Sequence, residues 1–230
     1  IGRTDAQILA QMRSDAKVLS LEEMLYAATL TEDVNEQLKF YQVTADNYPK
    51  CLRAHNNVAY TLLSQGKVDE ALASLEKAVA IQNNDVVKNN MAFAYLLNGE
   101  IAKAEETFNS MTAATDESKW GLGVIALTRG EYDKAVNFFG TEPCFNLALA
   151  QLLKGDVNQA KATLDKMTES CASGKPSYLR AVVGARLDDK TYMLNGLREA
   201  IAANANWKAY ASTDMEFAKY FADDAFKAAV

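Results

Sequence analysis

The sequence predicts an all-α protein built from stacked helical hairpins. Four glycines recur at intervals of 33, 31 and 25 residues, and apolar side chains around each glycine recur at helical spacing. Many segments are rich in Ala, Leu, Lys and Glu, and only 3 of the 230 residues are proline, which favours helices over strands. Because one hairpin cannot bury its apolar face alone, such hairpins stack on their neighbours.

The repeated frame is clearest around Gly66 and Gly99. An alanine precedes each glycine by seven residues, a second alanine follows five residues after it, and a large apolar residue follows nine residues after it. We expect the glycine to end the first helix in a left-handed conformation, so that the second helix folds back. The same frame fits Gly130 and Gly155. Their interval is too short for a full hairpin, so we expect the segment NFFGTEPCF to truncate a helix.

This frame of small residue, glycine, alanine and large apolar residue resembles the tetratricopeptide repeat. The resemblance covers residues 18 to 206, with Glu32 in the glycine place upstream and Asp188 or Asp189 at the turn downstream. It implies a right-handed superhelix of about five helical hairpins with a capping helix at each end. The predicted segments are an N-terminal helix (1–17), a degenerate repeat (18–51), repeats at 52–85 and 86–115, a truncated repeat (116–140), a repeat at 141–170, a degenerate repeat (176–206) and a C-terminal cap (207–230).

Both ends of the chain have the pattern of caps. Residues 4 to 16 predict a helix whose N-cap is Thr4 or Asp5. The last residues predict two short amphipathic helices that cover the exposed apolar face of the last hairpin, because the ends of a repeat array need a cap. The apolar side of this tail carries Phe217, Tyr220, Phe221 and Phe226.

Composition and motifs argue against several functions. The net charge of −6 and the pI near 5.0 disfavour nucleic-acid binding, which needs a basic face. No apolar run is long enough for a membrane span. His55 is the single histidine, and Cys51, Cys144 and Cys171 form no C-x-x-C pair, so we expect no metal site, no cofactor and no enzymatic activity. The acidic pairs in LEEM, DESK and ADDAF fit helix starts or polar faces.

The resemblance also predicts where a ligand binds, because the first helices of successive tetratricopeptide repeats line a concave groove. Asn57, Asn90 and Asn146 each lie nine residues before a repeat glycine, and Tyr60 and Phe93 lie six residues before one. Asparagine is a weak helix former. Some members of the family use an asparagine there to hold the backbone of an extended ligand, and a carboxamide can both donate and accept, as a peptide backbone requires. The alternative is that these carboxamides satisfy a carbonyl of the neighbouring hairpin.

The full set of predicted groove residues combines these positions with their neighbours. It consists of Arg53, Asn56, Asn57, Tyr60, Asn89, Asn90, Phe93, Trp120, Phe145 and Asn146. For Trp120 and Phe145, coverage by the chain's own segments is equally open, and Asn56 and Asn89 are expected to extend the polar surface. The carboxylate clamp of the family needs basic residues in a pattern that Arg53, Lys88 and Lys119 do not match, so an acidic C-terminal peptide is not the leading ligand.

The sequence therefore predicts a non-enzymatic protein–protein interaction scaffold that binds a peptide or partner segment in a concave groove. One alternative is a structural spacer or assembly module of a larger cell-envelope protein, and another is a helical domain that binds a small ligand. Segments such as LSLEEMLYAATLTEDVNE and FNLALAQLLKGD are similar to repeat-containing envelope proteins of Bacteroidetes-type bacteria. This similarity implies a periplasmic or outer-membrane-associated location, with the cytoplasm as the alternative.

Overall fold

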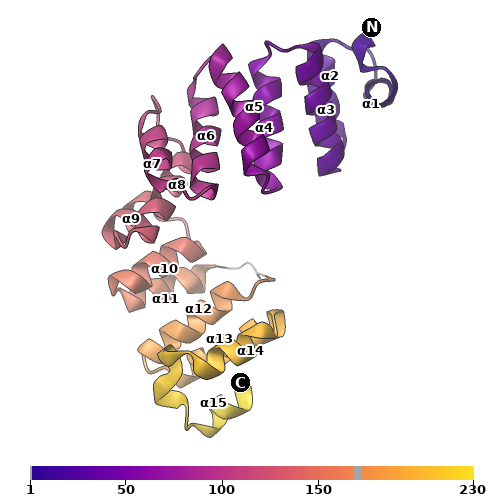
Figure 1. Cartoon of the computed structure of the whole chain (residues 1–230). Helices are drawn as coiled ribbons and strands as arrows, with labels where there is room; N and C mark the ends of the chain where they lie inside the picture. The colour runs from indigo at the N-terminus through magenta and orange to yellow at the C-terminus, as the bar shows by residue number, and fades with distance from the viewer. Residues whose placement is uncertain (1, 168–171) are drawn as a thin grey trace. The chain divides into compact units, whose positions relative to one another are not determined.

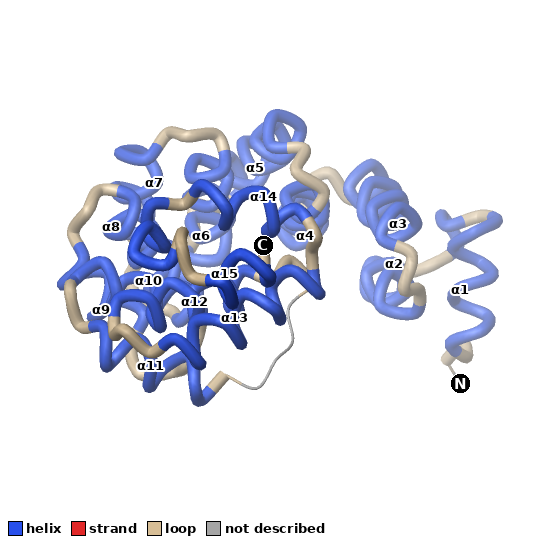
Figure 2. The backbone as a smooth tube through the Cα atoms, turned by 90° about the horizontal axis from the view of Figure 1, so that it is seen from below, coloured by secondary structure: helices blue, strands red, loops and turns tan. Residues whose placement is uncertain are grey.

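The computed structural model describes residues 2–167 and 172–230, and every regular element in these ranges is a helix (Figure 2). The prediction of an all-α fold is thereby confirmed for the described residues. The chain divides into two compact units, Ile1–Gly121 and Leu122–Val230. Each unit is a succession of short helices joined by tight turns (Figure 1).

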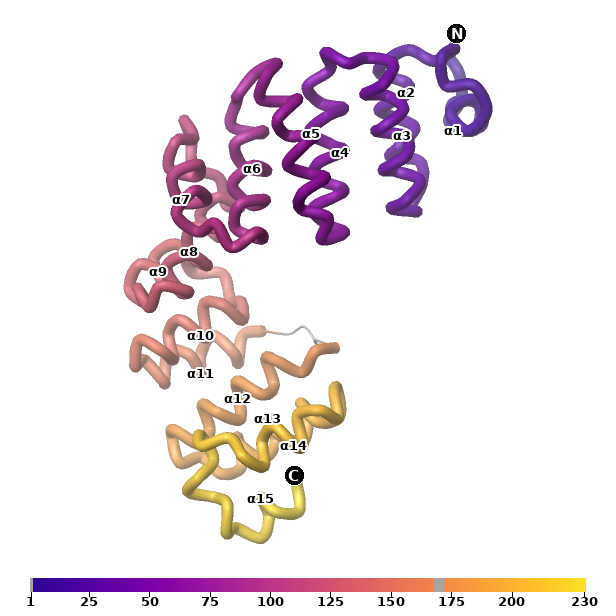
Figure 3. The backbone as a smooth tube through the Cα atoms, viewed as in Figure 1, coloured from indigo at the N-terminus to yellow at the C-terminus, as the bar shows by residue number. Residues whose placement is uncertain are grey.

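In the first unit, the first seven α-helices pack consecutively side by side (Figure 3). Short 3-10 segments, η1 (Ala16–Val18) and η2 (Ala28–Leu30), flank the second helix. The α-helices of this unit are α1 (Asp5–Ser14), α2 (Leu21–Ala27), α3 (Val34–Asn47), α4 (Leu52–Ser64), α5 (Val68–Ile81), α6 (Asp85–Leu97), α7 (Ile101–Asn109) and the first half of α8 (Asp116–Thr128).

In the second unit, α10 pairs with α11, and α12 pairs most extensively with α13. A 3-10 segment, η3 (Met215–Tyr220), lies in the C-terminal tail. The α-helices after α8 are α9 (Tyr132–Phe139), α10 (Phe145–Lys154), α11 (Val157–Lys166), α12 (Lys175–Arg186), α13 (Lys190–Ala203), α14 (Asn206–Thr213) and α15 (Asp224–Ala229).

Glycines make the hairpin turns as the sequence predicts. The backbone φ is +74° at Gly66 and +77° at Gly99, a region that glycine enters without steric cost. The N–H of Lys67, just after the first glycine, donates to the carbonyl of Leu62 at 2.9 Å and so closes the end of α4. The chain then reverses within three residues, and α5 folds back along α4.

Small residues allow the paired helices to approach closely. The alanines before and after each glycine, together with the large apolar residue that follows, form the interior of each hairpin. In the two clearest repeats, these buried residues are Ala59, Ala71, Leu75, Ala92, Ala104 and Phe108. The frame recognised in the sequence is therefore the packing pattern of the core.

The helix predicted to be truncated is short. α9 has eight residues and ends at Gly140, whose φ is +74°. Residues 141–144 contain no helix and lead directly into α10. The segment NFFGTEPCF therefore ends one helix early and begins the next.

The N-terminal helix begins at the predicted cap. The Thr4 hydroxyl accepts a hydrogen bond from the backbone N–H of Gln7 at 3.2 Å, and the Gln7 side chain accepts one from the backbone N–H of Thr4 at 2.9 Å. This reciprocal pair satisfies two backbone donors that the first helical turn leaves free.

The C-terminal tail packs against the last hairpin. Phe217 and Phe226 are fully buried and belong to one apolar cluster with Met193 and Leu197 of α13, whereas Phe221 is half-buried. The two short tail helices differ in type, because the first is the 3-10 segment η3 and the second is the α-helix α15. The buried phenylalanines nevertheless cover the apolar face that α12 and α13 would otherwise expose.

Ion pairs also join the C-terminal tail to the α12–α13 hairpin. Asp188, at the turn between α12 and α13, pairs with Lys219 at 2.8 Å and accepts a hydrogen bond from the Tyr220 hydroxyl. Asp223 pairs with Lys190 at 2.5 Å. Hydrogen bonds from Lys219 and Tyr220 lower the pKa of Asp188, and one from Lys190 lowers the pKa of Asp223. Both carboxylates are therefore stabilised in the charged form by contacts that hold the tail.

The histidine and the described cysteines lie in sites that suggest neither catalysis nor metal binding. His55 is buried, and its Nε2 lies 2.7 Å from the carbonyl oxygen of Pro49. Cys51 and Cys144 are half-buried free thiols, and Cys171 lies outside the described residues. No described helix is long and apolar enough to cross a bilayer, and no described cluster of His, Cys, Asp and Glu could hold a metal ion.

Candidate functional site

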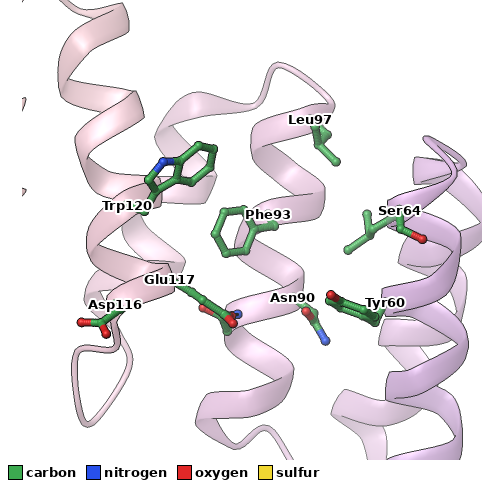
Figure 4. A pocket seen from close by; sticks show the side chains of 10 residues that line it. Tyr60, Ser64, Asn90, Phe93, Leu97, Asp116, Glu117 and Trp120 are labelled. Atoms are coloured by element: carbon green, nitrogen blue, oxygen red, sulfur yellow. Dashed lines mark hydrogen bonds between the residues drawn. The ribbon is translucent and has the colours of Figure 1, made fainter. Parts of the chain in front are cut away.

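The first unit contains an open groove between α4, α6 and the start of α8, which are the first helices of successive hairpins. Its apolar part has a volume of about 540 Å³ and lies between α4, α6 and α8 (Figure 4). Its lining residues are Tyr60, Leu63, Ser64, Asn89, Asn90, Phe93, Leu97, Asp116, Glu117 and Trp120. We call this part the aromatic half of the groove.

Large apolar side chains of the aromatic half are open to solvent. Tyr60 is 65% exposed, Leu97 is 59% exposed and Trp120 is 45% exposed. Phe93 lies between them, with its ring centroid 6.2 Å from that of Trp120 and 5.0 Å from that of Phe108 in an edge-to-face contact. Such contiguous exposed apolar surface, framed by polar groups, is typical of an interaction site.

A glycine sets the position of Trp120. A Cβ atom built on Gly121, the next residue, would lie 2.4 Å from Cζ of Phe108, so a larger residue at this position would displace the Phe108 ring. The close approach places the Trp120 ring beside Phe93, and Phe93 in turn rests on the buried Phe108 ring. The exposed aromatic surface is thus built on the packed core of the second clear hairpin.

A second cavity of about 450 Å³ adjoins the aromatic half and shares Tyr60, Asn89, Asn90, Asp116 and Glu117 with it. We call it the carboxamide half, because four asparagines converge on it. The complete lining is Asn56, Asn57, Tyr60, Asp85, Val86, Asn89, Asn90, Met111, Thr115, Asp116 and Glu117.

The four carboxamides have different partners. The Asn90 Nδ2 group donates to Oδ1 of Asn56 at 2.8 Å, and both residues are buried. The Asn89 Nδ2 group donates to Oε2 of Glu117 at 2.9 Å, and its Oδ1 is buried without a donor among the described residues. The half-buried Asn57 side chain has no hydrogen-bond partner in the described part of the chain. One carboxamide and one further oxygen thus remain unpaired in this half of the groove.

The charges around the groove are negative. Asp116 and Glu117 open α8, and Asp85 opens α6, where hydrogen bonds from the Thr112 hydroxyl and the N–H groups of Thr112 and Ala113 lower its pKa. Among the described residues, no lysine or arginine lines either half. Lys88 points its Nζ to the carbonyl oxygen of Ser110 at 3.0 Å.

The structure brings together most of the residues that the sequence predicted for the groove. These are Asn56, Asn57, Tyr60, Asn89, Asn90, Phe93 and Trp120. The expectation that Asn56 extends the polar surface is wrong, because it is buried against Asn90. For Asn90, the alternative of an internal partner therefore applies, although that partner is another carboxamide and not a backbone carbonyl.

The remaining predicted residues lie elsewhere. Arg53 lines neither half of the groove. Its guanidinium is hydrogen-bonded to both carboxylate oxygens of Glu22, at 2.5 and 3.2 Å. Phe145 and Asn146 begin α10 in the second unit. Phe145 packs against that unit's core, which favours the structural role for this side chain, and Asn146 is half-buried.

The sequence reasoning missed the acidic residues of the site. The sequence pattern assigns Asp116 and Glu117 to a helix start or a polar face and not to the groove. They lie four and three residues before Trp120, so helical spacing puts all three on one face of α8. Leu97, four residues after Phe93, follows the same rule. Spacing relative to the predicted aromatic positions could therefore have found these residues.

Comparisons with known proteins agree with this architecture. Residues 62–121, which span the end of α4 to the middle of α8, match the tetratricopeptide repeat family model. The resemblance seen in the sequence is thereby confirmed for the stretch that contains most of the groove. No curated protein sequence matches the chain.

Solved structures share the fold over nearly the whole chain. The crystal structure of the APC/C hetero-tetramer Cut9–Hcn1 aligns with a TM-score of 0.76 at 15% identity, over 97% of this chain and 45% of that one. A tetratricopeptide repeat protein from Parabacteroides merdae gives 0.64 at 17% identity, over 98% and 90% of the two chains. Pseudomonas aeruginosa pilF gives 0.61 at 12% identity, over 96% and 100%. The chain therefore spans less than half of the Cut9–Hcn1 chain, and these low identities show a common helical-repeat fold alone.

Proposed function

We propose that this protein is a non-catalytic scaffold that holds an extended segment of a partner protein in the groove between α4, α6 and α8. The tetratricopeptide-type fold supports protein binding in general. The observation that carries the specific proposal is the exposure of Tyr60, Leu97 and Trp120 around Phe93, beside a carboxamide with no internal partner. Tyrosine and tryptophan are the residues that most often dominate the energy of protein interfaces.

The carboxamide half favours an extended segment over a helix. In a helix the backbone N–H and C=O groups are bonded to one another, whereas an extended segment offers them to its surroundings. The Asn57 carboxamide can donate to one such carbonyl and accept from one such N–H. Asn56 and Asn90 already satisfy each other in part, so we assign them to shaping the groove.

The aromatic half supplies the apolar anchor. A bound apolar side chain would cover Trp120 and Tyr60, which the described residues leave open. Covering exposed apolar surface contributes about 25 cal/mol per Å², so the loss of one large aromatic side chain weakens binding by about 2 kcal/mol or more. The spacer alternative predicts no such loss, because it assigns no partner to this surface.

The test compares capture of partner proteins by the wild-type chain with capture by Tyr60→Ala and Trp120→Ala. Tyr210→Ala is the matched control, because Tyr210 is 59% exposed and lies outside the groove. We expect both groove variants to lose the same partners, while the control keeps them and all variants retain the helical circular dichroism spectrum. If the wild-type chain and both groove variants capture the same partner proteins equally well, the groove is not the binding site. The predicted periplasmic or outer-membrane-associated location remains a separate proposal, which cell fractionation tests.

A further inference from the structure

Building on the proposed function, we infer that the bound segment carries a lysine or arginine two residues away from its apolar anchor. The aromatic half binds the anchor, and the acidic start of α8 binds the basic side chain. The occupant is thus an extended peptide of a protein partner with the pattern apolar–x–basic, or basic–x–apolar.

The first argument is the charge of the groove. Asp116 and Glu117 line both halves, Asp85 lines the carboxamide half, and no described lysine or arginine lines either half. The start of a helix explains why carboxylates are tolerated there, because they favour the helix dipole. It does not supply a counter-charge, and the partner that the structure gives Glu117 is the neutral Asn89 amide. An acidic segment would therefore be repelled, and a basic side chain attracted.

The second argument is the balance of hydrogen-bonding groups. A carboxylate only accepts, so the Asn89 carboxamide must turn its NH₂ group toward Glu117, and this orientation leaves Asn89 Oδ1 without a donor. The acidic end of the groove therefore holds two carboxylates and an unpaired carboxamide oxygen, all acceptors. Lysine and arginine side chains only donate hydrogen bonds, so they would supply the donors that the acidic end of the groove lacks.

The third argument is spacing. Asp116 lies one helical turn before Trp120, and each residue of a helix adds about 1.5 Å, so the acidic and aromatic positions are about 6 Å apart along α8. In an extended peptide, alternate side chains lie on the same side and are separated by about 6.6 Å. One intervening residue therefore lets an apolar and a basic side chain of the segment reach Trp120 and the two carboxylates together.

The test uses synthetic heptapeptides in which one central position is Trp, Leu or Ala. The position two residues away, on either side, is Lys, Gln or Glu, and the other positions are a random mixture. Binding is measured by fluorescence anisotropy at low and high salt. We expect the Trp and Leu peptides with Lys to bind about fivefold more tightly than those with Gln, the gain from one ion pair in water, and peptides with Glu to bind most weakly. High salt should reduce this preference, because it shortens the range of charge interactions to about 3 Å at 1 M.

Matched variants separate this inference from the proposed function. Glu117→Gln keeps an acceptor for Asn89 and removes the charge, so together with Asp116→Asn it should abolish the preference for Lys peptides over Gln peptides. Glu76→Gln, an exposed position on α5 outside the groove, should retain the preference. If Trp120→Ala weakens all peptides but Lys and Gln peptides bind equally to the wild-type chain, the groove stands and the basic-segment inference falls. If no peptide binds, both proposals fail.

Discussion

The buried pair of carboxamides that joins the first two clear hairpins offers a sharp test of the packing. Asn56 on α4 and Asn90 on α6 are 8% and 7% exposed, and a hydrogen bond of 2.8 Å joins them. Removal of one partner leaves a buried polar group unpaired, which costs about 1–3 kcal/mol. Alanine recovers about 0.5 kcal/mol because it is a better helix former than asparagine. We therefore expect Asn56→Ala and Asn90→Ala each to lower the free energy of unfolding by about 0.5–2.5 kcal/mol.

The double variant carries the diagnostic information. Once both carboxamides are gone, no unpaired group remains from this contact, so the double variant should lose about 1 kcal/mol less than the sum of the single variants. The assay is urea denaturation followed by circular dichroism, together with hydrogen exchange of the α4 and α6 amides, because repeat arrays can open in parts.

Asn57→Ala is the matched control, because Asn57 lies beside Asn56 and its side chain has no partner among the described residues. We expect it to leave stability unchanged or raise it by about 0.5 kcal/mol, while peptide binding weakens. Additive losses in the double variant, or single variants as stable as the control, would refute the buried pair.

Three further predictions concern the second unit. Deletion of residues 212–230 should lower the melting temperature measured by calorimetry, because it uncovers the apolar face of α12 and α13; an unchanged value would show that the tail is no cap. The lowered pKa values of Asp188 and Asp223 mean that their contribution to stability is present at neutral pH and is lost as the pH falls below the ordinary aspartate value of about 3.9. Asp223→Asn should therefore flatten the dependence of melting temperature on acid pH, and a curve identical to that of the wild-type chain would contradict the role of this ion pair. Gly196→Ala should destabilise the protein by at least about 2 kcal/mol, because the new Cβ would lie 2.6 Å from the backbone nitrogen of Ala181, whereas Asn195→Ala on the exposed side should be neutral in the same urea titration.

The fold could be predicted because its determinants are local and repeated. A glycine such as Gly66 is needed wherever the backbone must turn with positive φ, and alanines such as Ala59 are needed wherever two helices cross. Because each repeat has the same requirements, glycines and alanines recur at fixed spacing, and this pattern can be recognised in a single sequence. The 3-10 geometry of η3 left no such trace, since an amphipathic pattern over six residues fits either type of helix.

The site could be predicted only in part. Tyr60 and Phe93, which were predicted from their offsets to the repeat glycines, do line the groove. These offsets could not predict that Asn90 is hydrogen-bonded to Asn56, or Arg53 to Glu22. Such pairs depend on how neighbouring hairpins are positioned against each other. The periodicity of the sequence predicts which face of a helix a residue occupies, whereas hydrogen bonds between side chains of different helices depend on how those helices pack.

The most direct test of the central claim uses one of the two tryptophans as a reporter. Trp207 is stacked on Tyr178 in the second unit, so Trp207→Phe leaves Trp120 in the groove as the sole tryptophan. We expect titration with a heptapeptide containing leucine and lysine to shift the Trp120 emission to shorter wavelength in a saturable way, with the same midpoint as the anisotropy titration. Saturable binding of that peptide with no change in Trp120 emission would contradict the account, because the segment would then bind outside the groove.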